Sequence, residues 1–275
     1  MDFKHLVKII YRTLSLITFA SVILLLVSFI SSFDMVNRYF TKGILPVLFE
    51  IFFVLGIILS FTVIIPLRKG EIVKTHNDTR KQKNLFLALA IILFICSFIF
   101  NVLVPNKLFI LSTLGACFFA GFAVMCALMR GYEYSHLKLV CLLLSAAFPL
   151  FMVIDNNSVV VRHSNSVENK LSSVFAIAFL LYVLYEGKRI FTGEHSKWHF
   201  ASMLLLTHTG FPISISYITV YLMGIATETT RFYQMILVFI ISIFVEIELI
   251  RFCRNALSHT KSEWEEIEST EKTDE

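Results

Sequence analysis

Eight long stretches of apolar residues decide what this chain can fold into. The first, residues 14–33, contains no charged side chain, and seven similar stretches follow it. The hydrocarbon core of a bilayer takes about 20 apolar residues of helix, whereas a surface helix of a soluble protein needs a polar face. Because hydrophobic residues make up 57% of the chain and charged residues 16%, a soluble core could not bury them all. The sequence therefore predicts an all-α integral membrane protein.

The predicted architecture is a bundle of antiparallel hairpins with about eight transmembrane helices. The expected spans are 14–33, 44–66, 85–104, 108–129, 139–154, 171–185, 201–224 and 233–252. The fifth and sixth are short, so we expect them to extend into flanking residues or to tilt; a count of seven would make one of them re-entrant. The membrane domain (14–254) lies between an N-terminal tail (1–13) and an acidic C-terminal tail (255–275), for which we expect frayed helix or disorder.

The positions of Lys and Arg predict the orientation. If both termini are cytoplasmic, the cytoplasmic segments hold 18 of the 24 basic residues, as the positive-inside rule requires. Short loops favour a bacterial cytoplasmic membrane. The basic residues sit at helix ends without a folded platform, so we expect no nucleic-acid partner. The bilayer is the expected partner, and a protein could dock at the acidic tail.

Several classes of chemistry lack their residues. The chain has no P-loop, HExxH, GxSxG or GxGxxG motif, so we expect no enzyme activity and no cofactor. The five cysteines lie in or beside apolar spans without a CxxC pair, which argues against a disulfide framework or a thiolate metal site. The first span has no Ala-x-Ala exit, so we expect an uncleaved helix and not a signal peptide.

Ionisable side chains inside a bilayer are costly and mark candidate sites. The main candidate site lies on the last two spans, where His208 and Glu246 could meet if these helices are neighbours. Thr207 and Thr209 flank the histidine, and Pro212 frees a backbone carbonyl. Such a pair could hold a proton or bind a solute; the alternative is a buried polar clasp that fixes the packing of the helices.

Two further groups are weaker candidates. Glu50, Asn101 and Asp155 are expected near the outer ends of their helices and could form a polar cluster, although anchoring at the membrane interface explains them as well. His195 and His199 have the spacing of two metal ligands on one helical face. A metal would need further ligands, so we expect none to bind there.

Two patterns predict packing. Small residues recur every three or four positions in the fourth span and predict a close helix contact; they are Ala116, Ala120, Ala123 and Ala127, with Gly115 and Gly121 beside them. Glu186 and Arg189 lie three residues apart and can pair on one helical face. Glu248 and Arg251 have the same spacing, so the two hairpins could be a repeat.

These features leave three hypotheses for the function. The first is transport or sensing of a small solute, with or without proton coupling, at His208 and Glu246. The second is a non-catalytic membrane scaffold or partner subunit. The third is a lipid-modifying enzyme, for which only the region of Glu186 and of Glu194 to His199 offers polar groups.

Overall fold

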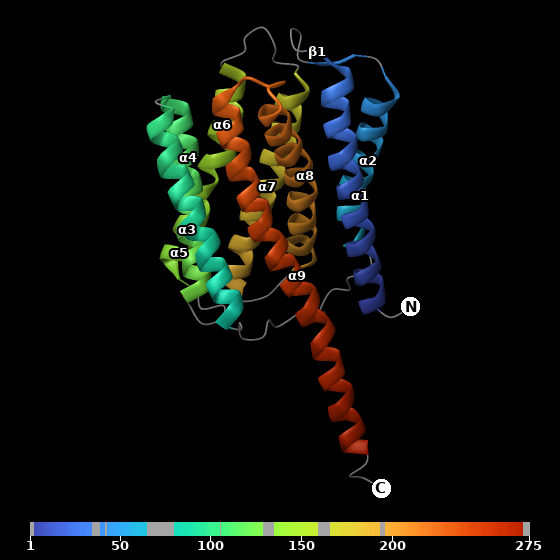
Figure 1. Ribbon diagram of the computed structural model, residues 1–275. Coiled ribbons are helices and arrows are strands. Elements are labelled where there is room, and N and C mark those ends of the chain that lie inside the picture. The colour runs from blue at the N-terminus through green and yellow to red at the C-terminus, as the bar shows by residue number, and fades with distance from the viewer. Residues whose placement is uncertain are drawn as a thin grey trace.

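The chain folds into a bundle of long helices, and its described residues include a pair of antiparallel strands of two residues each (Figure 1). The computed structural model describes residues 3–34, 39–41, 43–64, 80–104, 106–128, 135–158, 166–192 and 196–271. Its elements are α1 (Phe3–Ser32), β1 (Phe33–Asp34), β2 (Tyr39–Phe40), α2 (Ile44–Thr62), α3 (Arg80–Leu103), α4 (Lys107–Leu128), α5 (His136–Ser145), α6 (Ala147–Ser158), α7 (Val167–Thr192), α8 (Lys197–Leu222) and α9 (Thr229–Glu271).

Seven spans of the described chain are long and apolar enough to cross a membrane, with α5 and α6 together forming one of them. Large apolar side chains point outward at membrane depth, including Phe19 at 65% and Val102 at 70% exposure. Only lipid makes such a surface favourable, so the prediction of an all-α membrane protein is confirmed. The count of eight and the cytoplasmic termini stay predictions.

Helices α7, α8 and α9 form the centre of the bundle (Figure 1). In the most apolar window of α8, 78% of the residues are buried, against 28% in each of α1, α2 and α3. The α1–α2 hairpin packs on one side of this centre, and α3, α4 and α5 lie on the other. Helix α1 begins and α9 ends at the same end of the bundle, here called the inner end; the opposite end is the outer end.

Two expected helix boundaries differ from the structure. The span 139–154 is two helices, α5 and α6, separated at Ala146. Pro149 explains the break, because its ring clashes with the carbonyl of Ser145 and it cannot donate the hydrogen bond to that carbonyl. The span 171–185 extends into flanking residues at both ends, as expected for so short an apolar run, and α7 contains 26 residues. Its polar ends are helical because partners on other helices bind them.

The small-residue stripe of α4 is buried, as the spacing predicts. A Cβ atom added at Gly115 would overlap the backbone of Phe148, so α4 and α6 approach each other through this glycine. At the other end of the chain, α9 continues as helix to Glu271, through most of the tail for which frayed helix or disorder was expected. Its last part extends well beyond the inner end of the bundle (Figure 1).

Candidate functional site

His208 lies in a buried contact between three helices. Its Nε2 atom is 3.0 Å from the carbonyl oxygen of Phe53 on α2, and its Nδ1 atom is 2.8 Å from the hydroxyl of Thr18 on α1. A carbonyl only accepts, so Nε2 carries the hydrogen and donates it, while Nδ1 accepts from Thr18. A neutral imidazole thus satisfies both contacts. The side chain is fully buried, and it joins α8 to α1 and α2.

Gly56 makes this contact possible. A Cβ atom added at Gly56 would overlap the His208 ring. We therefore expect Gly56→Ala to displace the ring from Thr18 and Phe53 and to lower the free energy of unfolding by about 1–3 kcal/mol. Thermal unfolding of the purified protein in detergent measures the loss.

Gly121→Ala is the matched control. An added Cβ there would meet Cys141 Sγ at an ordinary 3.7 Å. Because alanine also restricts the unfolded chain, we expect this variant to be as stable as the wild type or more stable by about 0.4–1 kcal/mol. Equal effects of the two substitutions would contradict a role for Gly56 in seating the His208 ring.

Glu246 has a different environment from that of His208. Its Oε1 atom accepts a hydrogen bond of 2.6 Å from the hydroxyl of Tyr11 on α1. The structure does not bring His208 and Glu246 into contact, although α8 and α9 are neighbours. The reason is that α1 packs against both helices and supplies the partner of each side chain, Thr18 for one and Tyr11 for the other.

Glu246 and Tyr11 line a cavity of about 230 Å³ between α1, α8 and α9. We call this the α1 cavity. Its hydroxyl groups come from Tyr11, Ser15, Thr18 and Thr207, and the rest of its wall is apolar; those residues are Leu14, Phe19, Val22, Phe211, Ile215 and Leu249. The α1 residues recur every three or four positions, so one face of α1 forms one wall. Thr207 is the predicted α8 residue that reaches this cavity.

The remaining predicted α8 residues lie within the helix packing. Thr209 is buried, and its hydroxyl donates to the carbonyl oxygen of Leu205 at 2.9 Å. Pro212 sits inside α8 and lacks the N–H that would bond the carbonyl of His208. Gly210 approaches α9 closely, because a Cβ atom added there would overlap Ser242. These residues shape α8 where it meets its neighbours.

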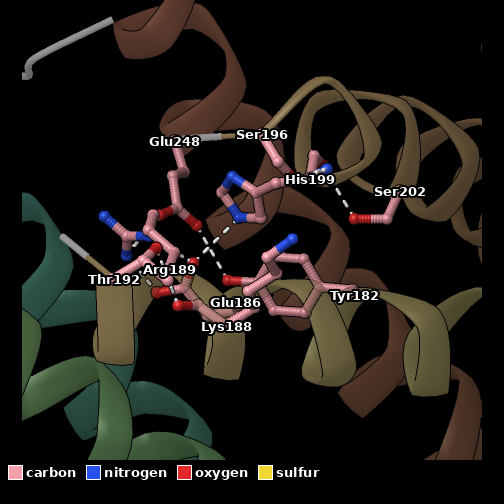
Figure 2. A network of polar contacts seen from close by, with 9 residues as sticks. All are labelled: Tyr182, Glu186, Lys188, Arg189, Thr192, Ser196, His199, Ser202 and Glu248. Carbon is pink, nitrogen blue, oxygen red and sulfur yellow. Dashed lines mark hydrogen bonds and ion pairs between the residues drawn. The ribbon is translucent and has the colours of Figure 1, made fainter. Parts of the chain in front are cut away.

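A buried network of charges joins α7, α8 and α9 near the inner end (Figure 2). This inner network consists of Tyr182, Glu186, Arg189, His199 and Glu248. Arg189 donates two hydrogen bonds to Glu186 and one of 3.3 Å to Glu248 Oε1. The Tyr182 hydroxyl donates to Glu248 Oε2 at 2.8 Å. His199 Nε2 lies 2.8 Å from Glu186 Oε2, so donors surround both carboxylates.

Local structure sets these side chains in place. Ser196 is the N-cap of α8 and accepts a hydrogen bond of 3.2 Å from the backbone N–H of His199, which holds His199 in the first turn. Arg189 follows Glu186 by three positions and pairs with it on one face of α7, as the spacing predicts. Glu248 takes Tyr182 and Arg189 as partners, both from α7.

Three side chains of the inner network are of types that can bind a metal ion. Glu186, His199 and Glu248 offer ligand atoms that all lie within 4.8 Å of one another. The guanidinium of Arg189 bridges the two carboxylates, so the protein itself supplies the cation that offsets their charge. Glu194 and His195, the other polar residues expected here, lie outside the described residues.

A second buried network lies at the outer end and consists of Asn156, Glu168, Asn169, Tyr217 and Arg231. Arg231 is 2% exposed and forms an ion pair with Glu168. It donates to the side-chain oxygens of Asn169 at 2.6 Å and Asn156 at 3.4 Å, and it lies over the ring of Tyr217. This outer network ties the start of α9 to α6, α7 and α8.

Glu50, Asn101 and Asp155, the predicted outer cluster, lie on three different helices and have different surroundings. Glu50 is exposed on α2, which packs on α1 and α8. Asn101 on α3 accepts a hydrogen bond from Thr113 on α4. Asp155 on α6 accepts from the amide of Asn106 at 2.9 Å and from that of Gln234 on α9 at 3.1 Å. Arg38 and Lys42, basic residues of the preceding loop that could neutralise Glu50, lie outside the described residues.

Sequence reasoning missed the partners that α1 supplies and the whole outer network. Tyr11 and Thr18 carry no charge, so nothing in the sequence separates them from other polar residues of α1. Arg231 offered one signal: it is a basic residue on the predicted outer side, where the positive-inside rule disfavours it. Glu228, three positions before Arg231, also pairs with it, because Glu228 Oε2 lies 3.6 Å from Arg231 Nε.

No protein-family model, curated protein or solved structure matches this chain. Its function is therefore inferred from the chemistry of the three polar regions. In the inner and outer networks each buried glutamate pairs with an arginine of the protein, Arg189 or Arg231. The α1 cavity differs, because its acid faces open space and has a single neutral donor.

Proposed function

We propose that this protein binds a small solute within the membrane, in the α1 cavity, and carries or senses that solute. The observation that supports the proposal is the carboxylate of Glu246, which lines the α1 cavity together with four hydroxyl-bearing side chains. An ionisable group at membrane depth costs free energy, so its presence there indicates a functional role. A cavity of mostly apolar wall with a few polar groups is the usual form of a ligand site.

The proposal is for a non-enzymatic protein. Within the described part of the chain, the inner network holds the acids, base and tyrosine that a lipid-modifying enzyme would use. Each carboxylate oxygen there already meets a donor of the protein, namely Arg189, His199 or Tyr182. That arrangement favours a structural role. We further propose cytoplasmic termini on the basis of the charge distribution, and a bacterial cytoplasmic membrane on the basis of the short loops.

Proton coupling, if present, would use Glu246 alone. His208 satisfies both ring nitrogens in its contact with Thr18 and Phe53 and is not among the residues that line the cavity. A carboxylate that faces the cavity can be neutralised by a proton or by a bound solute, and competition between the two would couple their movements. This coupling needs no His208–Glu246 pair.

Glu246→Gln tests the proposed function. Glutamine keeps the volume and can still accept the hydrogen bond from Tyr11, so only the charge is lost. We expect its free energy of unfolding to stay within about 1 kcal/mol of the wild type or to rise, because a site kept for function is often not optimal for stability. Stabilisation by added solutes should disappear. Thermal unfolding with and without a solute panel measures both quantities.

Glu50→Gln is the matched control, because Glu50 is exposed on α2. It should leave both stability and solute response unchanged. A loss of more than about 2 kcal/mol in Glu246→Gln would show instead that the carboxylate is part of the packing, and the solute site would then be rejected.

A scaffold role is the second candidate, and the length of α9 favours it. This helix has 43 residues, about twice what a bilayer requires. Seven acidic residues follow Ser262 against one lysine, so the extension would suit a basic partner. The two candidates differ in one respect: a scaffold should function equally well with Glu246 or with glutamine at that position.

A further inference from the structure

We propose that the solute of the α1 cavity is a lipophilic organic cation, such as a small aryl- or alkylammonium ion, that enters from the bilayer. This inference rests on the proposed solute-binding function and names the class of ligand. It follows from the charge of the cavity, the character of its walls and the direction in which it opens.

The charge of the cavity comes first. Among the described side chains, Tyr11 is the hydrogen-bond partner of Glu246, and no Lys, Arg or His forms an ion pair with it. The fully buried glutamates of the described chain differ from it: Glu186 and Glu248 bind Arg189, and Glu168 binds Arg231. Glu246 is half-buried, and it is the described cavity-lining glutamate whose charge is left for an external cation to offset.

The walls suit an apolar body attached to that cation. Phe19 and Phe211 present aromatic rings, which attract an organic cation through their π faces. Leu14, Val22 and Ile215 add aliphatic surface. None of the residues that line the cavity is basic, so a carboxylate or phosphate on the ligand would find no counter-charge. The volume of about 230 Å³ is below the roughly 300–1,000 Å³ of drug-sized sites and limits the ligand to a small molecule.

The cavity opens toward lipid. Phe19 and Ser15 belong to its wall and are exposed on the side of α1 that faces away from the bundle. The neighbouring residue Leu16 is 71% exposed on the same membrane-spanning helix. An amphipathic cation dissolved in the bilayer can therefore reach Glu246 sideways, between α1 and its neighbours.

Benzyltrimethylammonium is a suitable probe, because its quaternary nitrogen cannot lose a proton. Neopentylbenzene has the same shape, with carbon in place of the nitrogen, and carries no charge. Both probes are titrated as radiolabelled compounds into the full-length protein in nanodiscs, and binding to empty nanodiscs is subtracted. We expect saturable binding of the cation to the wild type and to Glu50→Gln, and binding at least tenfold weaker to Glu246→Gln.

A second pair of variants tests the location of the site. Val22→Trp fills the cavity and should abolish cation binding, whereas Leu16→Trp on the lipid-facing side of α1 should not. Size-exclusion profiles and thermal unfolding establish that each variant is folded. If Val22→Trp does not fold, the Glu246→Gln comparison still decides the matter.

The outcomes separate this inference from the proposed function. Equal binding of the cation to Glu246→Gln and the wild type would overturn the cation class, as would neopentylbenzene binding the wild type as tightly as the cation. Saturable binding of the neutral probe that Val22→Trp abolishes would leave the solute cavity in place. Failure of both probes to bind saturably would reject the cation class and remove support from the cavity itself.

Discussion

Replacement of Arg189 by methionine is expected to lower the free energy of unfolding by about 3–5 kcal/mol, the usual cost of removing one partner of a buried ion pair. Arg189 is 6% exposed and holds the carboxylates of Glu186 and Glu248. Without its guanidinium, the two acids face each other in a region where the ligand atoms of the inner network lie within 4.8 Å. Chemical or thermal unfolding in detergent measures the loss.

Lys188→Met is the control, since this neighbour on α7 is exposed. A surface charge contributes little, so we expect a change within about 0.5 kcal/mol. The double variant Glu186→Gln with Arg189→Met should recover part of the loss, because one excess negative charge is removed together with the cation. A cycle of the single and double variants gives the coupling energy. If Arg189→Met were as stable as Lys188→Met, the inner network would not hold α7 to α9.

The sequence predicts the class of fold because the solvent imposes it. A bilayer requires apolar helices of membrane length, and runs such as 85–104 and 108–129 reappear as α3 and α4 within a few residues. The ends of α7 were predicted less well, since a search for apolar runs stops at charged residues. Glu168 and Arg189 are nevertheless helical, because Arg231 binds the first and Glu186 and Glu248 bind the second.

The sequence identified Glu246 as a residue of the candidate site, but it did not identify the residues that surround Glu246. Glu246 stands out in the sequence as an acid within an apolar span, and the structure places it on the cavity wall. Its partner Tyr11 lies 235 positions away. Residue spacing reports which side chains share a helical face, but it does not report which helices pack together. That is why His208 and Glu246 looked like a pair while α1 supplies the partner of each.

Replacement of Arg231 by methionine is expected to cost about 3–5 kcal/mol as well, for the same physical reason at the opposite end of the bundle. Its loss leaves Glu168 buried without its cation and removes the donors to Asn156 and Asn169. Because Arg231 lies in the first turn of α9, the variant should loosen this helix at its outer end. Hydrogen exchange of backbone amides near Thr229 should therefore increase more than exchange near Glu248.

Lys170→Met is the matched control at the outer end, because Lys170 is exposed on α7 only two residues after Glu168. It should leave both stability and exchange unchanged. Glu168→Gln combined with Arg231→Met should restore part of the stability, since no uncompensated carboxylate then remains in that ion pair. Equal exchange at both ends of α9 in Arg231→Met would mean that the helix loosens as one unit. In that case the outer network would also hold Glu246 in its position, and cation binding by the α1 cavity would weaken in this variant although Arg231 does not line the cavity.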